Sequence, residues 1–296
     1  MTSSGPDLTG QVQMVDYVAK AGYRMYTPVA HGGMSDIFLG GWIDASKSHE
    51  KLALKFLRFM HDDDKRGKSI TRLARETKAW AKLSHPNIHP YLGTALNLDI
   101  YPESPAIVSP WMVNGDMSNY IQKTRYANKD ILLLQIIQGL VYLHSQGVVH
   151  GDLKGNNILI DNNGVAMITD FGRCKIMDDF DYSASVMTHA AYVAPEIFRD
   201  EHINSVTFRS DVWSLGMTAL ELFSGTKPLW RGERPIRIFH LVINREQPQP
   251  VDYPDFPGRY WEAFQNCWEF SPTDRPNADT ILQRLQAQQQ FHTSEM

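Results

Sequence analysis

The sequence predicts an α+β protein of two lobes, a smaller strand-rich lobe followed by a larger helical one. Residues 23–112 hold short apolar runs separated by glycines or polar stretches, which is the pattern of antiparallel strands and hairpins. Farther along, residues 129–146 and 209–225 are apolar nearly all round or at helical spacing. Because strands come first and helices afterwards, we expect an α+β architecture with a cleft between the lobes near residues 110–117.

Length and composition indicate a soluble globular protein. The 296 residues are 43% hydrophobic and 21% charged, with a net charge of -4, so a buried core is expected and a nucleic acid or an anionic membrane is not the expected main partner. Two cysteines are too few for a disulfide framework, which favours a reducing compartment. No apolar run reaches the roughly 18 residues of a membrane span. We expect a cytoplasmic protein, with the nucleus as the other candidate compartment.

One domain of two lobes is expected to fill most of the chain. The residues before it are small and polar, with an apolar patch from Val12 to Val18 that predicts a short helix. The expected bounds are 1–22 for an N-terminal extension, 23–288 for the domain (small lobe 23–110, linker or hinge 110–116, large lobe 117–288) and 289–296 for a C-terminal tail.

Five strands and one main helix are predicted for the small lobe. The helix covers residues 66–83, where apolar side chains recur at helical spacing. A glycine-rich turn at residues 31–35 could place backbone N–H groups against phosphates, although an ordinary hairpin turn explains it equally well. The predicted strands are residues 25–30, 36–42, 51–57, 91–98 and 105–112, and the helical stripe is Ile70, Leu73, Thr77 and Trp80.

The segment VHGDLKGNNILI, residues 149–160, carries the chemistry of the chain. It places Asp152, Lys154 and Asn157 within six residues between apolar flanks, and Asp170 follows ten residues after the end of the segment. One carboxylate can orient a hydroxyl, the other carboxylate and the amide can hold a hard divalent cation, and the lysine can neutralise a transferring group. This combination of side chains predicts chemistry on a phosphate ester.

Lys55 and Glu76 form a second candidate pair. Lys55 is the only charged residue between Ala53 and Leu57, and Glu76 lies beside the apolar stripe of the predicted helix. An ion pair between them is one interpretation. A lysine whose ammonium group reaches water and a surface glutamate are the alternatives.

Taken together, these motifs resemble the signature set of eukaryotic protein kinases over about residues 23–285. The resemblance rests on the strand lysine Lys55, its helix partner Glu76, the loop HGDLKGNN, the DFG turn at 170–172 and the APE sequence at 194–196. The blocks GGMSDIFLGGW, SPWMVNGDM and CWEFSPTDRP are most similar to the tyrosine-kinase-like branch, including fungal members. Arg275 resembles the arginine that pairs with Glu196, and Asp211 resembles the helix residue that supports the catalytic loop.

The resemblance implies a bilobal kinase fold, with a five-stranded antiparallel N-lobe carrying one main helix and a larger, mainly helical C-lobe. It also implies an ATP- and Mg²⁺-dependent reaction, in which Asp152 orients the substrate hydroxyl and Lys154 stabilises the phosphoryl group. Asn157 and Asp170 would hold Mg²⁺, and Lys55, paired to Glu76, would contact the ATP phosphates. The remaining nucleotide contacts implied are Val29, Gly32, Ile37, Ala53, Met112, Asp116 and Leu159.

Lys154, three residues before Asn157, is similar to the serine/threonine pattern, so protein substrates with Ser or Thr acceptors are expected. Three departures from the kinase pattern motivate an alternative, a pseudokinase or ATP-binding scaffold: Ala30 for a loop glycine, Gly151 for the arginine of HRD, and His189 for a threonine. Without that arginine, control by activation-loop phosphorylation loses its cation. A small-molecule phosphotransferase is a third alternative. The sequence predicts no oligomeric state.

Overall fold

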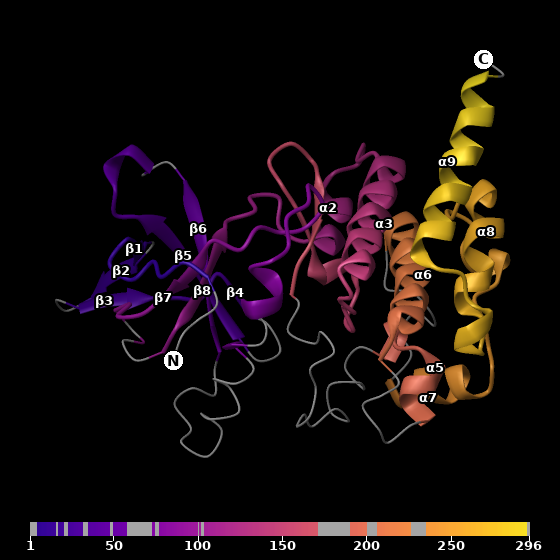
Figure 1. Ribbon diagram of the computed structural model, residues 1–296, viewed down its shortest axis with the longest axis horizontal. Coiled ribbons are helices and arrows are strands. Elements are labelled where there is room, and N and C mark those ends of the chain that lie inside the picture. Colours follow the sequence, from indigo (N-terminus) through magenta and orange to yellow (C-terminus); the bar gives the residue numbers. More distant parts are fainter. Residues whose placement is uncertain are drawn as a thin grey trace. The chain divides into compact units, whose positions relative to one another are not determined.

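The described residues form two compact units. The computed structural model describes residues 5–15, 17–20, 23–31, 35–47, 50–57, 73–74, 77–99, 101, 104–170, 190–199, 206–225 and 235–294. One unit comprises Met1–Ser84 and His89–Met112, and the other comprises His85–Ile88 and Val113–Met296. The first unit is built mainly of strands and the second mainly of helices (Figure 1). This order confirms the predicted α+β class.

An antiparallel sheet forms the centre of the first unit. Its strands follow the order β1-β5-β6-β8-β7, and β4 also pairs with β5. The sheet therefore has six strands, one more than the five predicted, because residues ahead of the predicted domain contribute β1. The bounds are Val12–Met14 (β1), Ala30–His31 (β4), Ser35–Trp42 (β5), Lys51–Leu57 (β6), Gly93–Ala95 (β7) and Ala106–Pro110 (β8), while β2 (Tyr17–Lys20) and β3 (Tyr23–Tyr26) form a separate hairpin.

The first predicted strand, residues 25–30, is split in two. β3 ends at Tyr26 and β4 begins at Ala30, with Pro28 in the gap. Proline has no N–H group to donate to a neighbouring strand, so a strand is readily interrupted there. β3 pairs with β2, and pairing with β5 begins only at Val29, whose N–H group donates to the carbonyl of Ile37 at 2.8 Å.

Residues 5–15, here called the N-terminal strap, cross the sheet from one edge to the other. At the β7 edge, the N–H of Leu8 donates to the carbonyl of Thr94 at 2.8 Å, and the N–H of Thr94 donates to the carbonyl of Pro6 at 3.0 Å. At the opposite end of the strand order, β1 pairs with β5, with Val12 opposite Trp42. The strap is therefore part of the first unit.

The helix predicted around residues 12–18 is wrong. Val12 and Met14 are buried and Gln13 between them is exposed, so the side chains alternate with the period of a strand. Burial of Leu8, Val12 and Met14 in the apolar core of the sheet decides the conformation, because only an extended segment places Val12 and Met14 on the same face.

The two faces of the sheet differ in character. One face is a closed apolar core in which Phe38, Leu54 and Val108 lie opposite one another on β5, β6 and β8, under the strap. The other face carries Ile37, Lys55 and Ile107, again in register on the same three strands. Lys55 is half-buried on that face. The alternation of β6 thus separates the lysine from the core.

The predicted helix over residues 66–83 is confirmed at residues 73–74 and 77–80, and it ends earlier than predicted, since residues 81–83 are described and are not helical. Leu73, Thr77 and Trp80 of the predicted stripe are buried. The indole Nε1 of Trp80 donates to the carbonyl of His89 at 2.5 Å, and the two rings lie 5.8 Å apart. This contact ties the helix to the chain that enters β7.

His89 gives the first unit a pH-dependent stability. Its side chain is buried, its Nδ1 has no hydrogen-bond partner within the described part of the chain, and burial, with the charge of Lys55, lowers its pKa from 6.5 to about 3. Since the folded pKa lies below the unfolded value, the neutral imidazole stabilises the fold above about pH 6.5, and this contribution is lost as the pH falls toward 3. Between pH 7 and pH 5 we expect a loss of about 2 kcal/mol.

Chemical denaturation at the two pH values tests this expectation. His89→Leu removes the titrating group, so its free energy of unfolding should fall by about 2 kcal/mol less than that of the wild type over the same interval. Equal losses in both proteins would contradict the assignment to His89.

The second unit is mainly helical, and two of its helices carry much of its core. Seven buried residues of α3 (Lys129–Ser145) include Leu133 and Ile137, and α6 (Phe208–Ser224) is buried from Ser210 to Phe223. Thr207 and Ser210 form a reciprocal capping box at the start of α6, and Gly225 ends it with a φ of 69°. None of the helices within the described ranges is long and apolar enough to cross a membrane.

The other elements of this unit surround those two helices (Figure 1). β9 and β10 form a two-stranded antiparallel ribbon. The bounds are Met117–Lys123 (α2), Ile158–Ile160 (β9), Ala166–Ile168 (β10), Pro195–Arg199 (α5), Pro235–Ile243 (α7), Gly258–Phe264 (α8) and Ala278–Ser294 (α9).

Candidate active site

One buried carboxylate of α6 binds the backbone of the loop between α3 and β9. Both oxygens of Asp211, which is 1% exposed, accept backbone N–H groups at 2.8 Å, one from His150 and one from Gly151. The Nε2 of His144 lies 2.9 Å from the same carboxylate. These contacts confirm the expectation that Asp211 supports the loop. Gly151 has a φ of 77°, a left-handed conformation that a glycine adopts without strain.

Asp152, Lys154 and Asn157 are brought together in this loop. The Nζ of Lys154 donates to Oδ2 of Asp152 at 2.8 Å, and Nδ2 of Asn157 donates to the same oxygen at 3.1 Å and to the Asp152 carbonyl at 2.7 Å. Lys154 is 7% exposed and Asn157 is 5% exposed. The cluster therefore presents a carboxylate whose position is set by two donors.

Asp170 is placed beside this cluster by the end of β10. The N–H of Thr169 donates to the carbonyl of Asn157 at 3.0 Å, and the carbonyl of Thr169 accepts from Nε2 of His150 at 2.9 Å. Asp170 itself has a φ of 65°, which is uncommon for a residue with a side chain and turns the chain sharply. Such conformations tend to occur at functional sites.

The donor set fits a magnesium ion. Because the Nδ2 of Asn157 donates to Asp152, the side-chain Oδ1 of Asn157 is the atom that would face a cation, and Asp170 would supply a carboxylate from the adjoining segment. Mg²⁺ is commonly held by one or two protein oxygens together with substrate phosphates, so a full protein cage is not required. Within the described ranges, no group of three or more His, Cys, Asp or Glu side chains could hold a metal ion.

Three predicted nucleotide contacts of the first unit, Ile37, Ala53 and Lys55, lie on the sheet strands β5 and β6. Ala53 stands between Leu39 and Ser109, and Lys55 stands between Ile37 and Ile107. The N–H of Val29 donates to the carbonyl of Ile37, the Val29 residue is 42% exposed, and Met112 follows the end of β8. Ile37, Ala53 and Lys55 are half-buried on this face, whereas Ile107 is 1% exposed.

Two further predicted contacts, Asp116 and Leu159, are neighbours in the second unit. They form an isolated antiparallel bridge, and Leu159 lies on β9. Asp116 is the N-cap of α2, and its carboxylate accepts from the backbone and side chain of Asn119 at 2.9 and 2.6 Å. The cap fixes the direction of that carboxylate.

Several predicted site residues lie outside the described residues. These are Gly32 of the glycine-rich turn, Glu76, and the segment 171–189 with His189. The pairing of Lys55 with Glu76 and the roles of the other site residues stay predictions.

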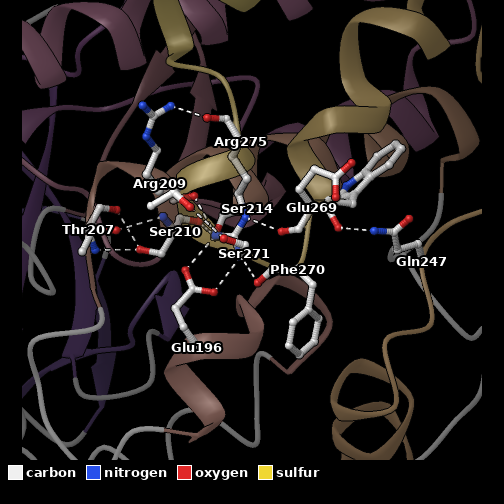
Figure 2. Close-up of polar contacts among 12 residues, drawn as sticks. Glu196, Thr207, Arg209, Ser210, Ser214, Gln247, Glu269, Phe270, Ser271 and Arg275 are labelled. Carbon is white, nitrogen blue, oxygen red and sulfur yellow. Dashed lines mark hydrogen bonds and ion pairs between the residues drawn. The ribbon is translucent and has the colours of Figure 1, made fainter.

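Glu196 and Arg275 form the pair that the sequence predicted. Figure 2 shows the guanidinium of Arg275 facing the carboxylate of Glu196, with Nη1 and Nη2 each 2.7 Å from one carboxylate oxygen. The same group donates to the carbonyls of Glu269 and Arg209 at 2.8 and 2.9 Å, and it lies 5.2 Å from the ring of Trp213. The Arg275 side chain is 0% exposed and that of Glu196 is 16% exposed, so this is a bidentate ion pair with a buried arginine.

Sequence reasoning missed a second buried carboxylate of α6, Glu221. Its carboxylate accepts hydrogen bonds from the Ser118 hydroxyl at 2.5 Å, the N–H of Gly155 at 3.0 Å and the hydroxyl of Tyr192 at 2.9 Å. Burial raises the pKa of Glu221, against the opposing effect of these hydrogen bonds. The signal was present in the sequence, because Glu221 is the one charged residue of the segment 212–223, which is mostly apolar.

Comparisons with known proteins agree with this geometry. The model of the family described as protein tyrosine and serine/threonine kinase matches residues 23–285. A Dictyostelium discoideum protein named as a probable serine/threonine-protein kinase is 30% identical over 265 residues, which is 88% of this chain and 50% of that protein. The mitogen-activated protein kinase kinase kinase MCK1 of Pyricularia oryzae is 32% identical over 229 residues, covering 74% of this chain and 15% of its own length.

A plant relative has similar coverage. Mitogen-activated protein kinase kinase kinase 3 of Arabidopsis thaliana is 29% identical over 255 residues, covering 85% of this chain and 40% of its own length. The chain thus spans half or less of the length of these three relatives. The family match, which extends over most of the chain and includes every motif discussed above, establishes that this chain belongs to the protein tyrosine and serine/threonine kinase family.

Proposed function

We propose that this chain is an ATP-dependent protein kinase domain that transfers the γ-phosphate of ATP to Ser or Thr hydroxyls of protein substrates. The observation that carries the proposal is the cluster of Asp152, Lys154 and Asn157, with two donors on one oxygen of the aspartate. A carboxylate held in this way can orient a hydroxyl for attack, and the adjoining ammonium can neutralise charge on the phosphoryl group.

The nucleotide and the metal follow from the same assignment. Lys55 would contact the ATP phosphates, Val29, Ile37, Ala53, Met112 and Leu159 would surround the adenine, and Asp116 would lie near the ribose. Asn157 and Asp170 would hold Mg²⁺, which neutralises the phosphates when bound. Gly32 and Glu76 complete the proposed set.

Incubation with labelled ATP and Mg²⁺ tests the activity. We expect the wild-type protein to phosphorylate itself or a generic basic protein, with label on Ser or Thr, and Asp152→Asn to be silent because the amide cannot accept the hydroxyl proton. Nucleotide binding by both proteins, measured separately, serves as the control for folding. If both bind ATP and neither transfers label, the ATP-binding scaffold is the better description.

We also propose a type of acceptor residue in the substrate, a cellular role and a location for this kinase domain. Lys154 near Asn157 and the names of the serine/threonine kinase relatives support Ser/Thr acceptors. The kinase kinase kinase names of two of those relatives support a role in signalling, with another kinase as a candidate substrate. A cytoplasmic location, or a nuclear one, is supported by the low cysteine content, and Cys267 is a buried free thiol.

A further inference from the structure

We infer that Glu221 is a positioning residue, which fixes the catalytic loop by accepting the backbone N–H of Gly155 and links that loop to two other segments. The inference rests on the proposed kinase function for its activity readouts. Gly155 follows Lys154 directly and precedes Asn157 by two residues. Holding its N–H group therefore restrains the backbone between two of the three clustered side chains.

The carboxylate of Glu221 joins three segments that are distant in sequence. Its Oε1 accepts from Ser118 on α2, and its Oε2 accepts both from Gly155 in the loop and from Tyr192 in the turn Ala190–Tyr192. Glu221 is 2% exposed, so water does not compete for these positions. If the carboxylate were removed, the Gly155 N–H and the Tyr192 hydroxyl would be left buried without this acceptor, which is costly in a dry site, and the half-buried Ser118 hydroxyl would lose it as well.

Gly155 fits this arrangement for steric reasons as well. A Cβ atom at this position would lie 2.4 Å from the Oγ of Ser118 and 2.5 Å from Oε2 of Glu221. Both distances are far inside van der Waals contact, so a side chain here would push the loop away from α6. The absence of a side chain at residue 155 is thus what lets the loop approach the carboxylate.

Tyr192 is hydrogen-bonded to α6 through both its side chain and its backbone. Its hydroxyl donates to Glu221, and its backbone carbonyl accepts from the Oγ of Ser214 at 2.8 Å. Burial and the charge of Glu221 raise the pKa of the Tyr192 hydroxyl, which therefore stays a donor. The residues just before Pro195–Arg199 and the catalytic loop consequently share one anchor.

An acceptor, not a negative charge, is what this geometry requires. In Glu221→Gln the amide oxygen can take the place of Oε2 and accept from Gly155 and Tyr192. The amide nitrogen can then donate to Ser118, because a hydroxyl both donates and accepts. Glu221→Leu has a similar size but offers no acceptor at all. Comparing these two variants therefore distinguishes the effect of losing the hydrogen-bond acceptor from the effects of losing the charge or changing the side-chain volume.

Steady-state phosphorylation of a serine-containing protein by the full chain is the first measurement. We expect Glu221→Leu to lower kcat on the order of a hundredfold, as for a misplaced catalytic group, while its affinity for ATP changes less than about threefold. Glu221→Gln should retain kcat within roughly fivefold of the wild type. Glu262→Leu, at an exposed position of α8, is the matched control and should behave as the wild type.

Hydrogen exchange of the Gly155 amide is the second measurement, and it does not depend on activity. The amide should be protected in the wild type and in Glu221→Gln, and should exchange at least tenfold faster in Glu221→Leu. A wild type without kinase activity would count against the proposed function, while this exchange pattern would still support the anchor.

Three outcomes would overturn the inference. They are a folded Glu221→Leu variant with normal kcat, a Glu221→Gln variant as inactive as Glu221→Leu, or unchanged exchange at Gly155 in Glu221→Leu. If Glu221→Leu does not fold, Tyr192→Phe replaces it, because it removes one donor and leaves the carboxylate. That variant should lower kcat severalfold without weakening ATP binding, and normal kcat would then contradict the link.

Discussion

Arg275→Met is expected to lower the free energy of unfolding by about 3–5 kcal/mol. The substitution keeps much of the apolar stem and removes the guanidinium, so Glu196 loses both of its 2.7 Å partners. The carbonyls of Glu269 and Arg209 lose a donor at the same time. Removing one member of such a pair costs more than the pair contributes, because the Glu196 carboxylate, whose side chain is only 16% exposed, would be left without its cation. Urea denaturation measures the effect.

A second variant and a control make this expectation specific. Arg275→Met combined with Glu196→Gln should be less destabilised than the sum of the two single variants, because the double variant buries no unpaired charge. Arg259→Met removes the arginine of an ion pair with Asp130 whose side chains are 42% and 40% exposed, and it should cost no more than about 1 kcal/mol. Similar losses for Arg275→Met and Arg259→Met would show that burial does not decide the cost.

Shortening two buried side chains of the N-terminal strap should lower the free energy of unfolding by a similar amount. Leu8→Ala together with Met14→Ala deletes two buried side chains from the core face of the sheet, and we expect a loss of about 4 kcal/mol or more in the free energy of unfolding. Each substitution removes apolar contacts and leaves a cavity that the surrounding strands fill only partly.

Gln13→Ala is the matched control for the strap. Gln13 lies between Val12 and Met14 on β1 and is exposed, so its replacement should change stability by less than about 0.5 kcal/mol. Thermal unfolding of the three proteins compares them directly. Equal stability of the double variant and the wild type would mean that the strap does not contribute to the core in solution.

The site was predictable from the sequence where short motifs carry the chemistry. Asp152, Lys154 and Asn157 are close in sequence, so a single loop brings them together, and their contacts could be expected before the fold was known. Glu221 could not be assigned in this way. Its partners Ser118, Gly155 and Tyr192 lie 103, 66 and 29 residues away from it in sequence, and only the packing of α6 reveals what it anchors.

The fold was predictable in its class and its main strands, because alternation and helical spacing are local patterns. The strap was not predicted, since its apolar residues fit either a helix or a strand by spacing, and its pairing with β5 and Thr94 depends on distant residues. Pro28 is the converse case. It was visible in the sequence, and the physical rule that proline interrupts a strand would have placed the break between β3 and β4 correctly.

The strap also bears on how this domain is produced in the laboratory. The family match begins at residue 23, and a fragment started there would lack β1. The edge of β5 from Leu39 to Trp42 would lose its partners, and the apolar face would lose Leu8, Val12 and Met14. Unpaired strand edges beside apolar surface invite pairing between molecules. Aggregation or apparent dimerisation of such a fragment would therefore reflect the missing strap. Expression of the domain should start upstream of residue 5.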